Sequence, residues 1–236
     1  IISPHDILHR VPFHILVSSS PESERRFLSD DVFLSTVPSA SFLLHAREKP
    51  LGSNRSFLSV APVSRKLPSS EKEVTAIPEN LFHDRSTLVG SDATAGRILE
   101  GFRQYDVVHI ASHALMNQSY PLYSFIESAD RKLELHELLG QKTQARIVIL
   151  SACNTGMSIG AADDDPTSDD LVSFPRALLA SGVVSVVSSL WLVEDEAEAE
   201  LVHSFFERLS VIHLQSPNDP FILSKALTTA QREFRA

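Results

Sequence analysis

Apolar runs alternate with helix-like segments along this chain, and that alternation limits its fold more than any other feature. Runs rich in β-branched and other apolar residues predict strands at 56–61, 88–89, 106–111, 147–150 and 183–190. Apolar residues at helical spacing predict helices near 69–77, 91–102, 135–139, 171–179, 194–209 and 220–235. Strands that alternate with helices form a mostly parallel sheet with helices on both faces. We therefore predict an α/β core over residues 51–236.

Residues 1–50 are interpreted as an N-terminal hairpin and helix extension that packs on this core within the same domain. Strands are expected at 1–2 and 11–17, and Pro12 favours an edge position for the second. Ser39 or Ser41 is expected to cap a short helix. The chain begins with Ile rather than Met, so we interpret it as a segment of a longer polypeptide.

Local signals predict where several helices begin. Ser70 and Glu73 have the spacing of a capping box, in which each side chain bonds the other residue's backbone. Ser91 and Asp92 are expected to cap the helix that follows them. The segment 125–133 predicts a small hairpin.

Composition excludes several classes of protein. The chain has 21 basic and 30 acidic residues, a net charge of -9, and no dense Lys/Arg cluster, which disfavours binding to nucleic acid or an anionic membrane. Its one cysteine cannot form an intrachain disulfide, so a reducing, cytoplasmic setting is expected. No apolar run approaches the roughly 20 residues that span a bilayer, and the first residues lack a signal-peptide pattern.

The only cysteine, Cys153, directly follows the predicted strand 147–150 and a Ser-Ala pair, and it opens a polar loop. His113 follows the end of the preceding core strand. If those strands are neighbours, both side chains lie at the carboxyl edge of the sheet, where functional groups of open parallel sheets gather. An imidazole there can take the proton of a thiol or stabilise the thiolate. Small neighbours leave room for a peptide backbone, and the Cys153 amide could donate to an oxyanion.

Simpler interpretations compete with this hypothesis. A lone cysteine at a strand end is more often a small buried apolar residue than a nucleophile. His109 is interpreted as a buried, hydrogen-bonded histidine, and no third ligand of matching spacing supports a metal site with His113. His136 and Glu137 lack the second histidine of a zinc-protease helix. Serine-hydrolase and P-loop motifs do not occur in the sequence.

Four segments resemble the CHAT domain in order and spacing, over nearly the whole chain: LHRVPFHIL, DVVHIASHALMN, LELHELLGQKTQARIVILSACNTG and DDLVSFPRALLASGVVSVVSSLWLVEDEAEAELVHSFF. CHAT peptidases are caspase-like cysteine proteases that are often joined to tetratricopeptide repeats. The resemblance implies a three-layer α/β/α caspase-hemoglobinase-like sandwich. It also implies a catalytic dyad of His113 and Cys153, with no metal or organic cofactor.

The resemblance further implies an oxyanion hole formed by the amides of Ala114 and Cys153. Ala114 replaces the usual glycine, and a positive φ there would cost about 1 kcal/mol. Pro175 also departs from the family, in which this helix is normally unbroken, but it could instead occupy the first turn of the helix.

The substrate site is predicted to involve Ser112, Ser151, Ala152, Trp191 and Asp195. Asp195 has a second interpretation as a cap of the helix that follows it. The acidic run 163–165 is interpreted as solvated, with a regulatory cation or a basic substrate as the alternative.

These observations predict a cysteine endopeptidase that cleaves a specific protein substrate and is gated by a flanking tetratricopeptide-repeat or sensor region. The competing hypothesis is an inactive caspase-like module that binds a peptide or a partner protein at the same edge.

Overall fold

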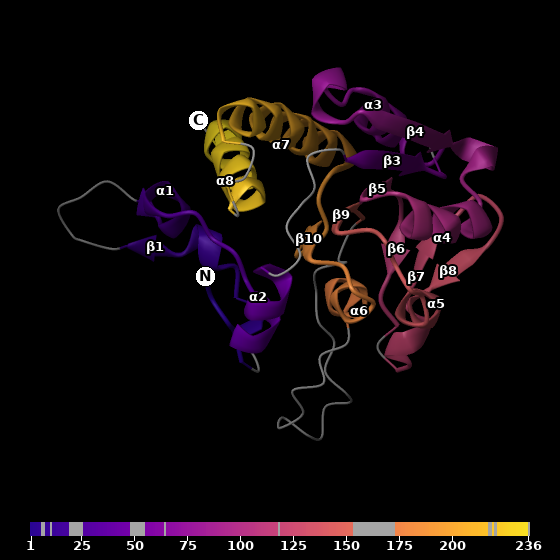
Figure 1. The fold of residues 1–236 in the computed structure, drawn as a ribbon, viewed down its shortest axis with the longest axis horizontal. Helices are drawn as coiled ribbons and strands as arrows, with labels where there is room; N and C mark the ends of the chain where they lie inside the picture. The colour runs from indigo at the N-terminus through magenta and orange to yellow at the C-terminus, as the bar shows by residue number, and fades with distance from the viewer. Residues whose placement is uncertain are drawn as a thin grey trace.

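A five-stranded parallel sheet forms the centre of the molecule (Figure 1). The computed structural model describes residues 1–5, 8–9, 11–18, 26–47, 55–63, 65–117, 119–152, 173–216, 219 and 221–235. The strand order is β10-β9-β5-β3-β4. The strands are β3 (Ser56–Ala61), β4 (Asp84–Val89), β5 (Val107–Ala111), β9 (Ile147–Ser151) and β10 (Ser185–Ser188). The predicted parallel sheet is therefore confirmed, and β4 is longer than the expected 88–89.

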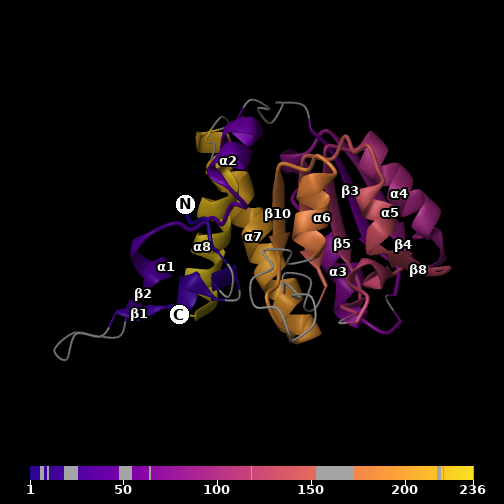
Figure 2. The same cartoon turned by 90° about the horizontal axis from the view of Figure 1, so that it is seen from below.

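Helices cover both faces of this sheet, as the apolar strands require. One face packs against α4 (Ala95–Gln104), α5 (Leu135–Leu139) and α6 (Phe174–Ala180). The other packs against α3 (Pro68–Thr75), α7 (Asp195–Gln215) and α8 (Ile222–Arg235). Figure 2 shows α7 and α8 on one side of β10 and α6 on the other. The result is the three-layer α/β/α sandwich that the sequence predicts.

The period-two alternation of the strands decides which side chains meet which helices. In β5, Val108 and Ile110 enter the core beneath α4, whereas Val107 faces α7 and α8. His109 shares the face of Val107 and is fully buried. A titratable side chain thus lies in the middle of the sheet, on the side of α3 and α7.

A second, three-stranded antiparallel sheet follows β5 directly. Its strands are β6 (Ala114–Leu115), β7 (Phe125–Glu127) and β8 (Lys132–Glu134), in that order. The hairpin expected at 125–133 is the β7–β8 pair. β6 begins three residues after β5 ends, so His113 lies between the two sheets. The central sheet fixes the backbone before it, and the small sheet fixes the backbone after it.

The described part of the N-terminal region differs from its prediction. The hairpin pairs β1 (Val17–Ser18) with β2 (Arg26–Phe27), and the expected strand at 11–17 is wrong because Phe13–Ile15 form a 3-10 helix. An apolar run becomes a strand only where another strand offers backbone partners, and none lies beside residues 13–15 in the described structure.

Two short helices complete this region, α1 (Leu28–Asp31) and α2 (Ala40–Arg47). Ser39 accepts the Phe42 amide at 3.1 Å, which confirms one of the two expected caps of α2. Arg232 of α8 donates to the carbonyl of Ser29, which ties the extension to the core.

Two predicted helix starts are wrong. The Ser70–Glu73 capping box does not form, since Ser70 Oγ donates to the carbonyl of Leu67 and α3 begins with Pro68. Helix α4 is capped by Thr94, whose hydroxyl accepts the Arg97 amide, rather than by Ser91 or Asp92. Short polar residues compete for such caps over a few positions, and tertiary packing selects one.

Pro175 lies in the first turn of α6, behind the N-cap Ser173. That is the second of the two interpretations above, and a proline is tolerated there because its missing N–H has no partner within the helix.

Candidate active site

Neighbouring strands bring His113 and the residue before Cys153 to one edge of the sheet. Strands β5 and β9 pair in parallel with Ala111 opposite Ser151, and the Ser112 amide continues the pairing by donating to the Ser151 carbonyl at 3.0 Å. Adjacent strands lie about 4.8 Å apart. The expectation that these two strands are neighbours is confirmed, whereas Cys153 itself lies outside the described residues.

The backbone around His113 is held by the small sheet. The His113 carbonyl accepts the Glu127 amide at 2.8 Å, and the next pair in the register is Ala114 opposite Ile126. Hydrogen-bonded and non-hydrogen-bonded pairs alternate in an antiparallel ladder, so the N–H of Ala114 points away from β7, along the open edge of β6. Ala114 is in a strand, so its backbone is extended and the expected cost of a positive φ does not arise.

A buried polar chain lies directly beneath these strand ends. Nε2 of His109 is 2.7 Å from Oε1 of Glu73 and 3.3 Å from Oγ of Ser151. The role of Nε2 depends on the tautomer: when it carries the proton, Glu73 at 2.7 Å is the main acceptor and Ser151 Oγ can share only the same hydrogen. The His109 ring is 0% exposed and the Glu73 side chain 3% exposed. The interpretation of His109 as a buried, hydrogen-bonded histidine is confirmed.

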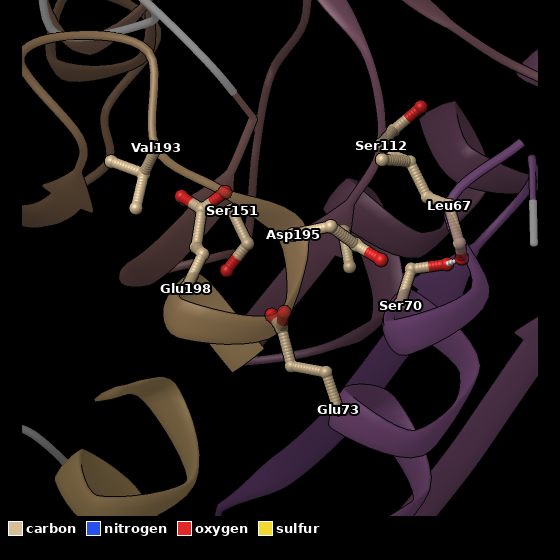
Figure 3. Close-up of a pocket in the computed structure, with 9 residues that line it drawn as sticks. Leu67, Ser70, Glu73, Ser112, Ser151, Val193, Asp195 and Glu198 are labelled. Carbon is tan, nitrogen blue, oxygen red and sulfur yellow. Dashed lines mark hydrogen bonds between the residues drawn. The ribbon is translucent and has the colours of Figure 1, made fainter. Parts of the chain in front are cut away.

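A pocket with a cavity volume of about 30 Å³ opens above this chain, between α3, the ends of β5 and β9, and the start of α7 (Figure 3). That volume holds water rather than a peptide side chain. Its polar lining comprises Ser70, Glu73, Ser112, Ser151, Asp195 and Glu198.

Three of the lining side chains are carboxylates, and their proximity changes how one of them titrates. Burial raises the pKa of Glu198 to about 7, and the neighbouring charges of Glu73 and Asp195 act in the same direction. A hydrogen bond with Ser189 opposes the shift. A carboxyl group that holds a proton near neutral pH therefore lies beside the strand ends.

The predicted substrate residues divide into two groups. Ser112, Ser151 and Ala152 are buried, and their polar groups bond within the fold. Ser112 Oγ donates to the Glu127 carbonyl at 2.7 Å, and the Ala152 carbonyl accepts Ser189 Oγ at 3.2 Å. Ser112 and Ser151 border the pocket, while their hydrogen bonds also hold the site together.

Trp191 and Asp195 are the more accessible members of the predicted set. Trp191 follows β10, is 45% exposed, and stacks on His14 with ring centroids 5.9 Å apart. Asp195 lines the pocket, and its carboxylate accepts the Ser69 amide of α3 at 2.9 Å. Asp195 belongs to the acidic first turn of α7, as the helix-dipole argument expects, but the N-cap position of α7 is Glu194 and the helix end that the Asp195 side chain caps is that of α3.

Sequence reasoning missed Glu73 and Glu198 as parts of this site. The sequence predicts a capping box for Glu73, whereas in the structure this residue lies next to Val74 on the inner side of α3, where an ionisable side chain needs a buried partner. Glu198 lies in the acidic first turn of α7, where the helix dipole alone accounts for its presence. The acidic run 163–165 lies outside the described residues.

Within the described ranges, no cluster of three or more His, Cys, Asp or Glu side chains is arranged to hold a metal ion. The helices of the described structure include none that is long and apolar enough to cross a membrane.

Comparison with known proteins places the chain in a family. The CHAT domain family model matches residues 1–236. Tetratricopeptide repeat protein 28 of the mouse is 25% identical over 260 residues, which covers 86% of this chain and 10% of that protein. The chain thus spans about a tenth of the length of the curated relative it matches. A family match over the full chain, on an α/β/α sandwich with a parallel central sheet, shows that this chain belongs to the CHAT domain family.

Proposed function

We propose that this chain is a cysteine endopeptidase domain that works through a dyad of His113 and Cys153. The Cys153 thiolate attacks the peptide carbonyl carbon, and the carbonyl π electrons move onto oxygen. Collapse of the tetrahedral intermediate forms a thioester and breaks the C–N bond, while the His113 imidazolium protonates the leaving amine. Water, deprotonated by the same imidazole, then hydrolyses the thioester and releases the thiol.

The adjacency of β5 and β9 carries this proposal. It leaves His113 and Ala152, the residue before the nucleophile, at the ends of two hydrogen-bonded strands. Side chains that leave neighbouring strand ends on the same edge can span the few ångströms between them.

The direction of the Ala114 amide adds support. It points off the ladder, so it is available to an oxyanion together with the Cys153 amide. Two such donors would stabilise the negative charge that develops in the transition state.

The substrate and the control of the site are proposed at the level of chemical class. The substrate is a protein segment, and the reaction needs no metal or organic cofactor. The mouse relative is named for its tetratricopeptide repeats, so we place such a repeat or a sensor region in the full-length protein, where it would gate the site. A reducing compartment such as the cytoplasm suits a free thiol.

One observation favours the alternative of an inactive, peptide-binding module. The pocket at the strand ends is water-sized, and Ser112 and Ser151 are occupied by hydrogen bonds within the fold. In that case the same edge would bind a partner without cleaving it.

Because Cys153 is the sole cysteine, iodoacetamide alkylation of the protein measures this thiol alone. An activated thiol should react faster near pH 7 than a free cysteine of pKa ~8.5, and the His113→Ala variant should lose that excess. Cleavage of candidate partner proteins by the full-length protein, compared with Cys153→Ala, tests turnover. Ordinary reactivity that His113→Ala leaves unchanged, together with no cleavage, would falsify the peptidase proposal.

A further inference from the structure

We propose that Glu73 and His109 are positioning residues of the cysteine–histidine dyad. They form a buried hydrogen-bonded chain that runs from α3 through β5 to Ser151 of β9, and it holds the two strand ends that carry the reacting groups. This inference rests on the peptidase function proposed above.

This hydrogen-bonded chain connects β5 and β9, which lead to the two dyad residues, to helix α3. His109 precedes His113 by four residues along β5, and Ser151 precedes Cys153 by two residues along β9. Glu73 lies on α3, and its carboxylate is the only ionic group bonded to the His109 ring in the described structure. The His109 imidazole therefore links the position of α3 to the positions of both strand ends.

The buried hydrogen-bonded chain of Glu73, His109 and Ser151 costs free energy of folding, which argues that it has a role beyond packing. His109 packs 5.5 Å from the ring of Phe206, and Nδ1 is buried with no hydrogen-bond partner among the described residues. A buried polar pair pays a desolvation cost that well-packed apolar side chains avoid, so stability alone does not call for it. Hydrogen bonds have directions that apolar contacts lack, and the contact of Nε2 with Ser151 Oγ at 3.3 Å favours one rotation of the Ser151 side chain.

The backbone at the same point is secured by two further bonds. The Ser151 carbonyl accepts the Ser112 amide, and the Ala152 carbonyl accepts Ser189 Oγ. Side chain and backbone of residues 151 and 152 are thus held from β5, α3 and the end of β10. These contacts fix the last described residues before Cys153.

A matched control exists at the opposite end of β5. The carboxylate of Asp106 accepts both the amide and the hydroxyl of Ser56, at 3.0 and 2.9 Å. This pair also joins a carboxylate to the edge of the sheet, but at the amino ends of β3 and β5, away from the dyad. Asp106→Ala therefore removes two hydrogen bonds to a carboxylate and leaves the hydrogen bonds of Glu73, His109 and Ser151 in place.

The test is the pH profile of Cys153 alkylation by iodoacetamide in the full chain, read beside thermal unfolding. Glu73→Ala and His109→Phe should move the midpoint of the wild-type profile up toward the free-thiol value of ~8.5 and lower the rate at pH 7 about tenfold. Glu73→Gln keeps an oxygen acceptor for Nε2 and should restore most of the rate. Asp106→Ala should lower the unfolding temperature while leaving the midpoint unchanged.

The outcomes separate this inference from the function on which it rests. An activated wild-type thiol whose profile is the same in Glu73→Ala and Asp106→Ala overturns the positioning role and leaves the peptidase intact. A wild-type thiol of ordinary reactivity overturns the positioning role, and it overturns the peptidase proposal as well when the full-length protein cleaves no candidate partner. If His109→Phe does not fold, Glu73→Ala and Glu73→Gln still decide the question, since neither changes a strand residue.

Discussion

Replacing Glu198 by glutamine should make the protein more stable at neutral and alkaline pH and leave it unchanged in acid. Burial and the carboxylates of Glu73 and Asp195 raise the pKa of Glu198 from its ordinary 4.5 to about 7. The difference of about 2.5 pH units, at ~1.4 kcal/mol each, sets an upper limit of about 3.5 kcal/mol. Glu198 is partly exposed, so screening by solvent reduces the expected gain to roughly 1–3 kcal/mol.

The direction in which the stability changes with pH follows from proton binding. Between pH 4.5 and 7 the folded state keeps a proton on Glu198 that the unfolded chain has released, so the free energy of unfolding falls as the pH rises. The loss is complete above pH 7. Glutamine is neutral throughout and can still bond Ser189, so the variant should lack this loss.

Urea unfolding of wild type and Glu198→Gln at half-unit steps from pH 4.5 to 8.5, under reducing conditions, measures the effect. The comparison must be between the two proteins, because burial lowers the pKa of His14 and of His213 and thereby weakens the fold as the pH falls below 6.5. That contribution is common to both proteins and cancels in the difference. Parallel curves across the whole range would show that Glu198 titrates normally and would refute the reasoning.

Three further changes test the packing and the surface. Gly101→Ala places a Cβ 2.2 Å from Cδ2 of Leu58, so calorimetry should show a loss of about 1–3 kcal/mol, and an unchanged melting temperature would contradict this contact. Gly182→Ala meets only an ordinary van der Waals contact, 3.7 Å from Cγ2 of Thr143, but has φ +110°, so it should cost roughly 1–2 kcal/mol by the same measurement, and a neutral result would argue against that backbone conformation. Trp191, the only tryptophan, stacks on His14, so its fluorescence should be quenched as His14 is protonated, with a midpoint below 6.5 because burial and Arg235 lower that pKa. The transition should vanish in His14→Gln, and its persistence there would exclude this stack as the cause.

The core of the fold could be predicted from the sequence because the pattern that encodes it is local. Strands β5, β9 and β10 each show their apolar run within a few consecutive residues, and the order of strands and helices along the chain implies a parallel sheet. The placement of His113 at a strand end followed from the same pattern. The strand predicted at 11–17 was wrong because a short apolar run does not reveal whether a partner strand is present.

The contacts that join distant segments could be decided only by the tertiary structure. Glu73 and His109 are 36 residues apart, and Asp195 and Ser69 are 126 apart. Spacing along α3 linked Glu73 to Ser70 as a cap, whereas the packing of α3 over β5 turned its carboxylate toward a buried imidazole.

The sequence by itself determined that an apolar strand leads into the only thiol of the chain and that another leads into a histidine, because side-chain chemistry and a period of two residues are enough to show both. The tertiary structure alone decided that those strands are neighbours, that Ala114 is extended with its amide directed off the ladder, and that the Glu73 carboxylate reaches His109 in β5. The physical reason is that hydrogen-bond partners across a fold depend on which surfaces pack together. That choice is made by the whole core, so no single segment encodes it.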